Sequence, residues 1–110
     1  MNHRIKALFF DLGDTIMIEQ SEIKDAEGTT QQADLIPGMA EALRQFQALG
    51  YALALVADSR PNTPVNVLRQ HALYDLFDYL AISEVVGVSK PDSRMFQVTL
   101  DALAIPKQDY

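Results

Sequence analysis

Three short apolar runs, at residues 5–11, 51–57 and 79–82, stand out along the chain. Runs of this length, without regular polar alternation, are typical of strands that are covered on both faces of a parallel sheet. Turn-forming residues follow the first two runs: Gly13 comes after the first run, and Asp58 begins the turn after the second. We therefore expect three strands, the first two of which end in polar turns.

Helical patterns lie between and after these runs. Apolar residues recur every three or four positions in residues 37–49 and 92–103, which predicts an amphipathic helix in each segment. A shorter helix is expected at about 63–71, because Thr63 is a suitable N-cap and Pro64 fits the first helical position. In the last helix, the expected buried stripe consists of Phe96, Leu100 and Leu103.

The alternation of strands and helices predicts one α/β domain spanning residues 1–110. We expect a doubly wound parallel sheet of the Rossmann-like kind, in three α/β/α layers with right-handed crossovers. Residues 16–35 are rich in polar and turn-forming side chains and are too few to form a domain. They are expected to form a short surface flap.

Several polar residues at predicted strand ends or turns are candidates for chemistry. In doubly wound sheets, ligands bind beyond the carboxyl ends of the strands, so Asp11, Asp14, Asp58 and Lys90 could converge on one crevice. Asp14 and Thr15 add a carboxylate and a hydroxyl that suit a hard cation or a phosphate group. The alternative for each of these residues is a solvated turn.

The overall charge narrows the choice of partners. A formal net charge of −6 lacks the excess of Lys and Arg that binds phosphate backbones or anionic lipid, so we expect neither nucleic acid nor a membrane surface. No apolar run approaches the roughly 18 residues that are needed to cross a bilayer. The absence of cysteine excludes disulfides and thiolate chemistry, and it fits a cytoplasmic protein.

The order of these segments resembles the N-terminal part of the core domain of the haloacid dehalogenase-like (HAD-like) hydrolase superfamily. Residues 9–16, with the sequence Phe-Phe-Asp-Leu-Gly-Asp-Thr-Ile, are similar to the first family motif. Residues 36–38 and the helix after them resemble the segment that leads to the second strand, and residues 53–59 occupy the place of the second motif. Residues 87–92, Gly-Val-Ser-Lys-Pro-Asp, resemble the third motif.

This resemblance implies a hydrolase, because most of the family are phosphatases, with dehalogenases and mutases among them. Asp11 would be the nucleophile and form an aspartyl-phosphate, and Lys90 would place a positive charge beside it. Mg²⁺ would be the cofactor, bound by the Asp11 carboxylate and by the backbone carbonyl of Gly13. The substrate would be a small-molecule or other phosphoester, contacted by Thr15, Asp58 and Ser59.

Two positions depart from the family pattern. Gly13 replaces the second Asp of the first motif, which in the family protonates the leaving oxygen and then activates water. The loss of a positioned general acid typically costs about 10²- to 10⁴-fold in rate, and Asp14 could replace it only if the loop bends differently. Ala57 replaces the Ser or Thr that ends the second motif, so Ser59 would have to reach the phosphoryl group from the loop.

The fourth family motif, an acidic pair that follows another strand, is expected after Tyr110. That strand normally lies beside the first strand, so without it we expect an unpaired strand edge through which the chain could self-associate. Two alternatives to a phosphoester hydrolase remain. One is a catalytically degenerate HAD-like fold used for binding or assembly, and the other is a dehalogenase, whose branch also lacks the second Asp and uses no metal.

Overall fold

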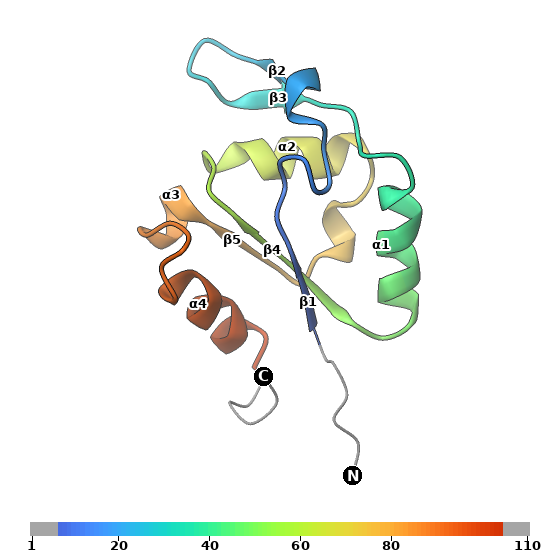
Figure 1. Ribbon diagram of the computed structural model, residues 1–110, viewed down its shortest axis with the longest axis vertical. Helices are drawn as coiled ribbons and strands as arrows, with labels where there is room; N and C mark the ends of the chain where they lie inside the picture. The colour runs from blue at the N-terminus through green and yellow to red at the C-terminus, as the bar shows by residue number, and fades with distance from the viewer. Residues whose placement is uncertain (1–6, 105–110) are drawn as a thin grey trace.

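Three parallel strands in the order β1-β4-β5 form the central sheet of the computed structural model, which describes residues 7–104 (Figure 1). They are β1 (Ala7–Phe10), β4 (Ala52–Ala57) and β5 (Tyr79–Ile82). Each coincides with a predicted apolar run, although residues 5 and 6 of the first run lie outside the described residues. The predicted parallel sheet is therefore confirmed.

Helices cover both faces of this sheet. α1 (Met39–Ala48) and α2 (Asn62–Gln70) pack on one face, and α4 (Arg94–Ala102) packs on the other (Figure 1). Two shorter elements complete the connections around β5: a 3-10 turn η2 (Tyr74–Leu76) before it and α3 (Ser83–Val86) after it. The arrangement is the expected three-layer α/β/α sandwich.

The unbroken apolar runs follow from this double coverage. Along β4, Leu55 belongs to the core cluster beneath α1 and α2, while the next residue, Val56, belongs to the cluster beneath α4. In β1, Phe10 lies 6.1 Å from Phe46 of α1, measured between ring centroids. Since successive side chains of a strand point to opposite faces, every position of a covered strand must be apolar.

The buried side of α4 differs from the predicted stripe. Met95, Thr99 and Leu100 are buried, whereas Phe96 is 39% exposed and lies over Phe9 at the margin of the sheet, with ring centroids 6.4 Å apart. Leu100 is buried as predicted, but Met95 takes the place that was expected for Phe96. The polar Thr99 is tolerated in the core since its hydroxyl donates a hydrogen bond to the Met95 carbonyl at 2.8 Å.

Residues 16–35 have more regular structure than their composition indicates. They contain a 3-10 turn η1 (Glu19–Ser21) and a two-stranded antiparallel hairpin of β2 (Ile23–Lys24) and β3 (Thr30–Gln32). We call these residues the flap. Figure 1 shows the hairpin above α2, at the end of the molecule where β1 and β4 finish.

Side chains of α2 hold β3 in place. The Thr30 backbone N–H donates to the Thr63 hydroxyl at 3.0 Å, and the Asn66 side chain donates to the Thr30 carbonyl at 3.0 Å. The Gln70 side-chain carbonyl accepts from the Ala33 N–H at 3.0 Å. Thr63 was expected to cap α2, but the helix begins at Asn62 and no side chain caps it. That prediction was wrong, because the Thr63 hydroxyl satisfies a buried donor of the flap instead.

Two further observations concern the sheet edge and membranes. Among the described residues, β1 pairs with β4 on one side and with no strand on the other, so self-association through that edge stays a prediction. Between residues 7 and 104, no helix has the length and apolar character needed to cross a membrane.

Candidate active site

The loop that follows β1 turns sharply and presents Asp11 at the strand tip. The Leu12 carbonyl accepts backbone hydrogen bonds from Ile16 at 2.9 Å and from Met17 at 3.0 Å, which closes a single helix-like turn. Leu12 and Ile16 are buried beneath this turn, whereas the Asp11 side chain is 49% exposed. The buried side chains of Leu12 and Ile16 therefore fix the loop, while the Asp11 carboxylate faces solvent.

Asp11 forms an ion pair with Lys90. The Lys90 Nζ lies 3.0 Å from the Asp11 Oδ2, and the Lys90 side chain is 26% exposed. The loop that carries Lys90 is fixed in turn by Asp58, whose Oδ1 accepts a hydrogen bond from the Lys90 backbone N–H at 2.9 Å. Three of the four polar residues that were expected to converge thus meet at one edge of the sheet, as its topology predicts.

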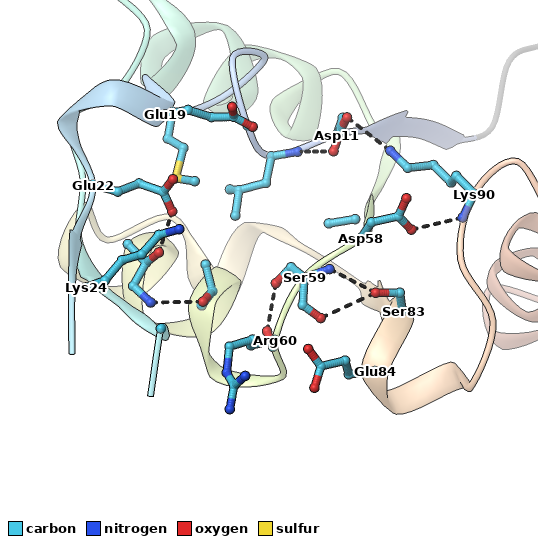
Figure 2. Close-up of a pocket in the computed structure, with 17 residues that line it drawn as sticks. Asp11, Glu19, Glu22, Lys24, Asp58, Ser59, Arg60, Ser83, Glu84 and Lys90 are labelled. Carbon is cyan, nitrogen blue, oxygen red and sulfur yellow. Dashed lines mark hydrogen bonds and ion pairs between the residues drawn. The ribbon is translucent and has the colours of Figure 1, made fainter. Parts of the chain in front are cut away.

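A pocket of about 610 Å³ opens around this edge (Figure 2). Its wall combines the tips of β1 and β4, the start of α3 and the inner side of the flap. The residues lining it are Asp11, Leu12, Gly13, Met17, Glu19, Glu22, Lys24, Gly28, Thr30, Ala57, Asp58, Ser59, Arg60, Thr63, Ser83, Glu84 and Lys90. The flap therefore forms part of the pocket rather than a separate surface.

The turn after β4 is braced against the end of β5. The Ser59 N–H donates to the Ser83 hydroxyl at 2.9 Å, and the Ser59 hydroxyl donates to the Arg60 carbonyl at 2.7 Å (Figure 2). The Arg60 side chain donates to the Thr29 hydroxyl at 3.2 Å, which links this turn to the flap. Ser59 lines the pocket, but its hydroxyl is engaged with the neighbouring backbone.

Five of the predicted site residues line the pocket: Asp11, Gly13, Asp58, Ser59 and Lys90. Asp14 and Thr15 are absent from its wall. Asp14 adopts a left-handed conformation, with φ of 56°, and its Oδ1 accepts a hydrogen bond from the Glu19 N–H at 3.0 Å. The structure thus brings five residues together and gives Asp14 a local contact; the chemical role of each stays a prediction.

The pocket has more acidic than basic side chains. Its carboxylates are Asp11, Glu19, Glu22, Asp58 and Glu84, and its cations are Lys24, Arg60 and Lys90. Sequence reasoning missed the residues that the flap contributes, because a polar segment gives no signal of the direction in which its side chains point. Arg60 and Ser83 were missed as well, although both follow predicted strands.

The donor set fits Mg²⁺ better than a metal held wholly by protein. Within residues 7–104, no group of three His, Asp or Glu side chains could hold an ion. Mg²⁺ is commonly bound by one or two carboxylates, with waters and substrate phosphates completing six oxygens. The Asp11 carboxylate and the Gly13 carbonyl, which accepts none of the hydrogen bonds among the described residues, could supply such a partial set.

Asp92, the last residue of the third motif, has a structural contact. Its carboxylate pairs with the Arg94 guanidinium at 2.7 Å and accepts the Arg94 backbone N–H at 2.9 Å, at the start of α4. These hydrogen bonds lower the pKa of Asp92 from 3.8 to about 2. Asp92 thus stays ionised down to acidic pH and fixes the turn that leads from Lys90 into the helix.

Comparisons with known proteins bear on the family and the fold of the chain. A sequence model of the haloacid dehalogenase-like hydrolases matches residues 18–110. The glyceraldehyde 3-phosphate phosphatase of Pyrococcus abyssi (strain GE5 / Orsay) is 28% identical over 74 residues, which are 67% of this chain and 31% of the relative. The (S)-2-haloacid dehalogenase of Pseudomonas putida is 30% identical over 71 residues, which are 64% of this chain and 32% of the relative. The chain thus spans about a third of the length of these relatives.

Among solved structures, a HAD-superfamily hydrolase from Ehrlichia chaffeensis has a TM-score of 0.76 and 15% identity, over 90% of this chain and 72% of that one. This likeness concerns the fold. The family match includes the segment that carries Lys90 and extends over most of the sequence. The chain therefore belongs to the haloacid dehalogenase-like hydrolases.

Proposed function

We propose that the pocket hydrolyses phosphoesters, with Asp11 as the nucleophile. The observation that carries this proposal is the carboxylate of Asp11, exposed at a strand tip and held 3.0 Å from the Lys90 ammonium. An ion pair in an open polar pocket orients the carboxylate and leaves it accessible to a substrate, which a nucleophile requires. A phosphatase among the relatives supports the same class of substrate.

The chemistry divides one difficult displacement into two steps. An oxygen of Asp11 attacks phosphorus, the bond from phosphorus to the ester oxygen breaks, and an aspartyl-phosphate forms. Water then attacks the same phosphorus and releases inorganic phosphate and the Asp11 carboxylate. Lys90 contacts Asp11 directly, so its charge lies where the negative charge of the transferring group develops.

The acidic pocket wall explains why a divalent cation is part of the proposal. Five carboxylates against three cations oppose the approach of a phosphate monoester dianion. Mg²⁺, held by the Asp11 carboxylate and the Gly13 carbonyl, would supply the charge that offsets this repulsion. The positions of Asp11 and Lys90 depend on the chain alone.

The direct test measures both product and intermediate. The chain is incubated with 4-nitrophenyl phosphate and Mg²⁺, release of phosphate is followed, and the reaction is quenched with hydride to reduce any acyl phosphate. We expect phosphate release that a chelator abolishes, and a reduced residue at position 11 in peptide mass spectra. A reduced residue elsewhere, or no release above the rate in buffer, would exclude Asp11 as the nucleophile.

Lys90→Met tests the second member of the pair. Removing one positioned charge at the transferring group is expected to lower kcat by about 10²- to 10³-fold. The fold should persist, because an exposed or half-exposed ion pair contributes only about 0 to 1 kcal/mol to stability. Arg44→Met, an exposed change on α1 away from the pocket, is the matched control. Equal kcat values for the two variants would show that Lys90 is a solvated turn residue.

Dehalogenation of a 2-haloacid is the second candidate. The observation in its favour is the 30% identity with a haloacid dehalogenase, together with a glycine at position 13. Halide leaves without a proton, so Asp11 could displace it from carbon with no acid beside it. Release of chloride from 2-chloropropionate, with no phosphate released from 4-nitrophenyl phosphate, would favour this reaction over the first.

A further inference from the structure

The side chain of Glu19 fills the space that Gly13 leaves open. A Cβ atom added at position 13 would lie 2.0 Å from the Glu19 Oε1 and 2.7 Å from its Cδ. Both residues line the pocket, and Figure 2 shows the Glu19 side chain extending from the flap toward Asp11. The absence of a side chain at position 13 is therefore matched by a carboxylate that enters from η1.

The backbone of Glu19 is fixed, while its carboxylate forms no ion pair with another described residue. Its N–H donates to the Asp14 Oδ1 at 3.0 Å, and its carbonyl accepts the Glu22 N–H at 3.1 Å. The ion pairs between described residues involve Asp11 with Lys90 and Asp92 with Arg94, and neither includes Glu19. The residue is exposed, so its carboxyl group is accessible to water.

We propose that Glu19 is the general acid and base of this site, an assignment that rests on the proposed phosphoester hydrolysis. In the first step, the carboxylic acid of Glu19 gives its proton to the ester oxygen as the bond from that oxygen to phosphorus breaks. In the second step, the Glu19 carboxylate takes a proton from the water that attacks the aspartyl-phosphate. Asp11 and protonated Glu19 are regenerated, so the cycle balances.

Gly13 leaves the space that the Glu19 carboxylate occupies. Any side chain at position 13 would occupy the space of the Glu19 carboxylate and force it out. Asp14 has the complementary part of a positioning residue, since its own carboxylate accepts the Glu19 N–H and lies outside the pocket wall. Gly13 thus takes the place of the acid that the family has in the loop, and it leaves room for the Glu19 carboxylate from the flap.

The test uses leaving groups that differ in their need for a proton. Glu19→Gln keeps the shape of the side chain but cannot donate a proton. In the first turnover, we expect it to slow transfer from a simple alkyl phosphate by about 10²- to 10⁴-fold. Transfer from 4-nitrophenyl phosphate, whose phenolate leaves unprotonated, should change by less than about threefold, followed by slow release of phosphate. Glu27→Gln, in the same flap but outside the pocket, is the matched control.

Gly13→Ala tests the same inference without touching the acid. We expect it to slow transfer from the alkyl phosphate as Glu19→Gln does, and to cause no further loss when the two changes are combined, because the new methyl group displaces the carboxylate. If Asp11→Asn inactivates the chain but Glu19→Gln turns over the alkyl phosphate at the full rate, the role of Glu19 is overturned and the proposed hydrolysis is not. A starting chain with no activity that depends on Asp11 would overturn the proposed function and this assignment with it.

Discussion

Asp11→Asn is expected to lower the rate of phosphate release by on the order of 10⁴-fold or more, the loss typical of removing a covalent nucleophile. Asparagine has nearly the same shape as aspartate but cannot form a stable acyl phosphate. Hydride quenching should therefore also leave position 11 unmodified. Both losses should appear with the aryl and the alkyl substrate, because phosphorus must be attacked whatever the leaving group is.

The control for this variant separates chemistry from folding. The Asp11 side chain is 49% exposed, so loss of its ion pair with Lys90 should leave the free energy of unfolding almost unchanged. Asp75→Asn, an exposed change on η2 outside the pocket, should retain full activity. Activity of Asp11→Asn equal to that of Asp75→Asn would mean that another group attacks the substrate.

The strands and their order were predictable because burial on two faces leaves a strong signal. β4 must satisfy a core on each side, so its residues from Leu53 to Ala57 are all buried and all apolar. Chain topology then fixes where the polar residues beyond the strand tips can lie. This is why Asp11, Asp58 and Lys90 could be expected at one edge from the sequence, whereas Asp14, expected there as well, lies outside the pocket.

The flap was not predictable in the same way. Its hairpin depends on hydrogen bonds between polar groups far apart in sequence, such as the Thr30 N–H and the Thr63 hydroxyl. Polar residues of this kind have the same pattern in a solvated loop, and Thr63 before a proline looks like a helix cap. Only the tertiary contact decides between these uses of the hydroxyl.

Only some of the residues that make up the site could be predicted from the sequence. The sequence shows that Gly13 lacks an acid, and it offers Asp14 as the nearest substitute. The positive φ of Asp14 directs its carboxylate to the Glu19 backbone instead. Glu19 lies six positions beyond Gly13, a spacing that no regular helix or strand brings together, so only the closed turn of the loop reveals their contact.

Leu55→Ala is expected to lower the free energy of unfolding by about 2 to 5 kcal/mol, a large part of the roughly 5 to 15 kcal/mol that stabilises a typical domain. Leu55 is fully buried at the centre of β4, where it pairs with Phe10 in β1 and with Leu80 in β5. The change removes apolar contacts and leaves a cavity, because the surrounding strands and helices relax only partially into the vacated space. Urea titration of the chain, followed by circular dichroism, measures the effect.

Leu49→Ala is the matched control, because it makes the same chemical change at a side chain that is 74% exposed beyond the end of α1. It should alter the free energy of unfolding by no more than about 0.5 kcal/mol. Similar losses for the two variants would show that β4 is not the centre of the core. Since Leu55 does not line the pocket, its variant should still retain the first-turnover rate wherever it is folded, which separates the scaffold from the chemistry that it positions.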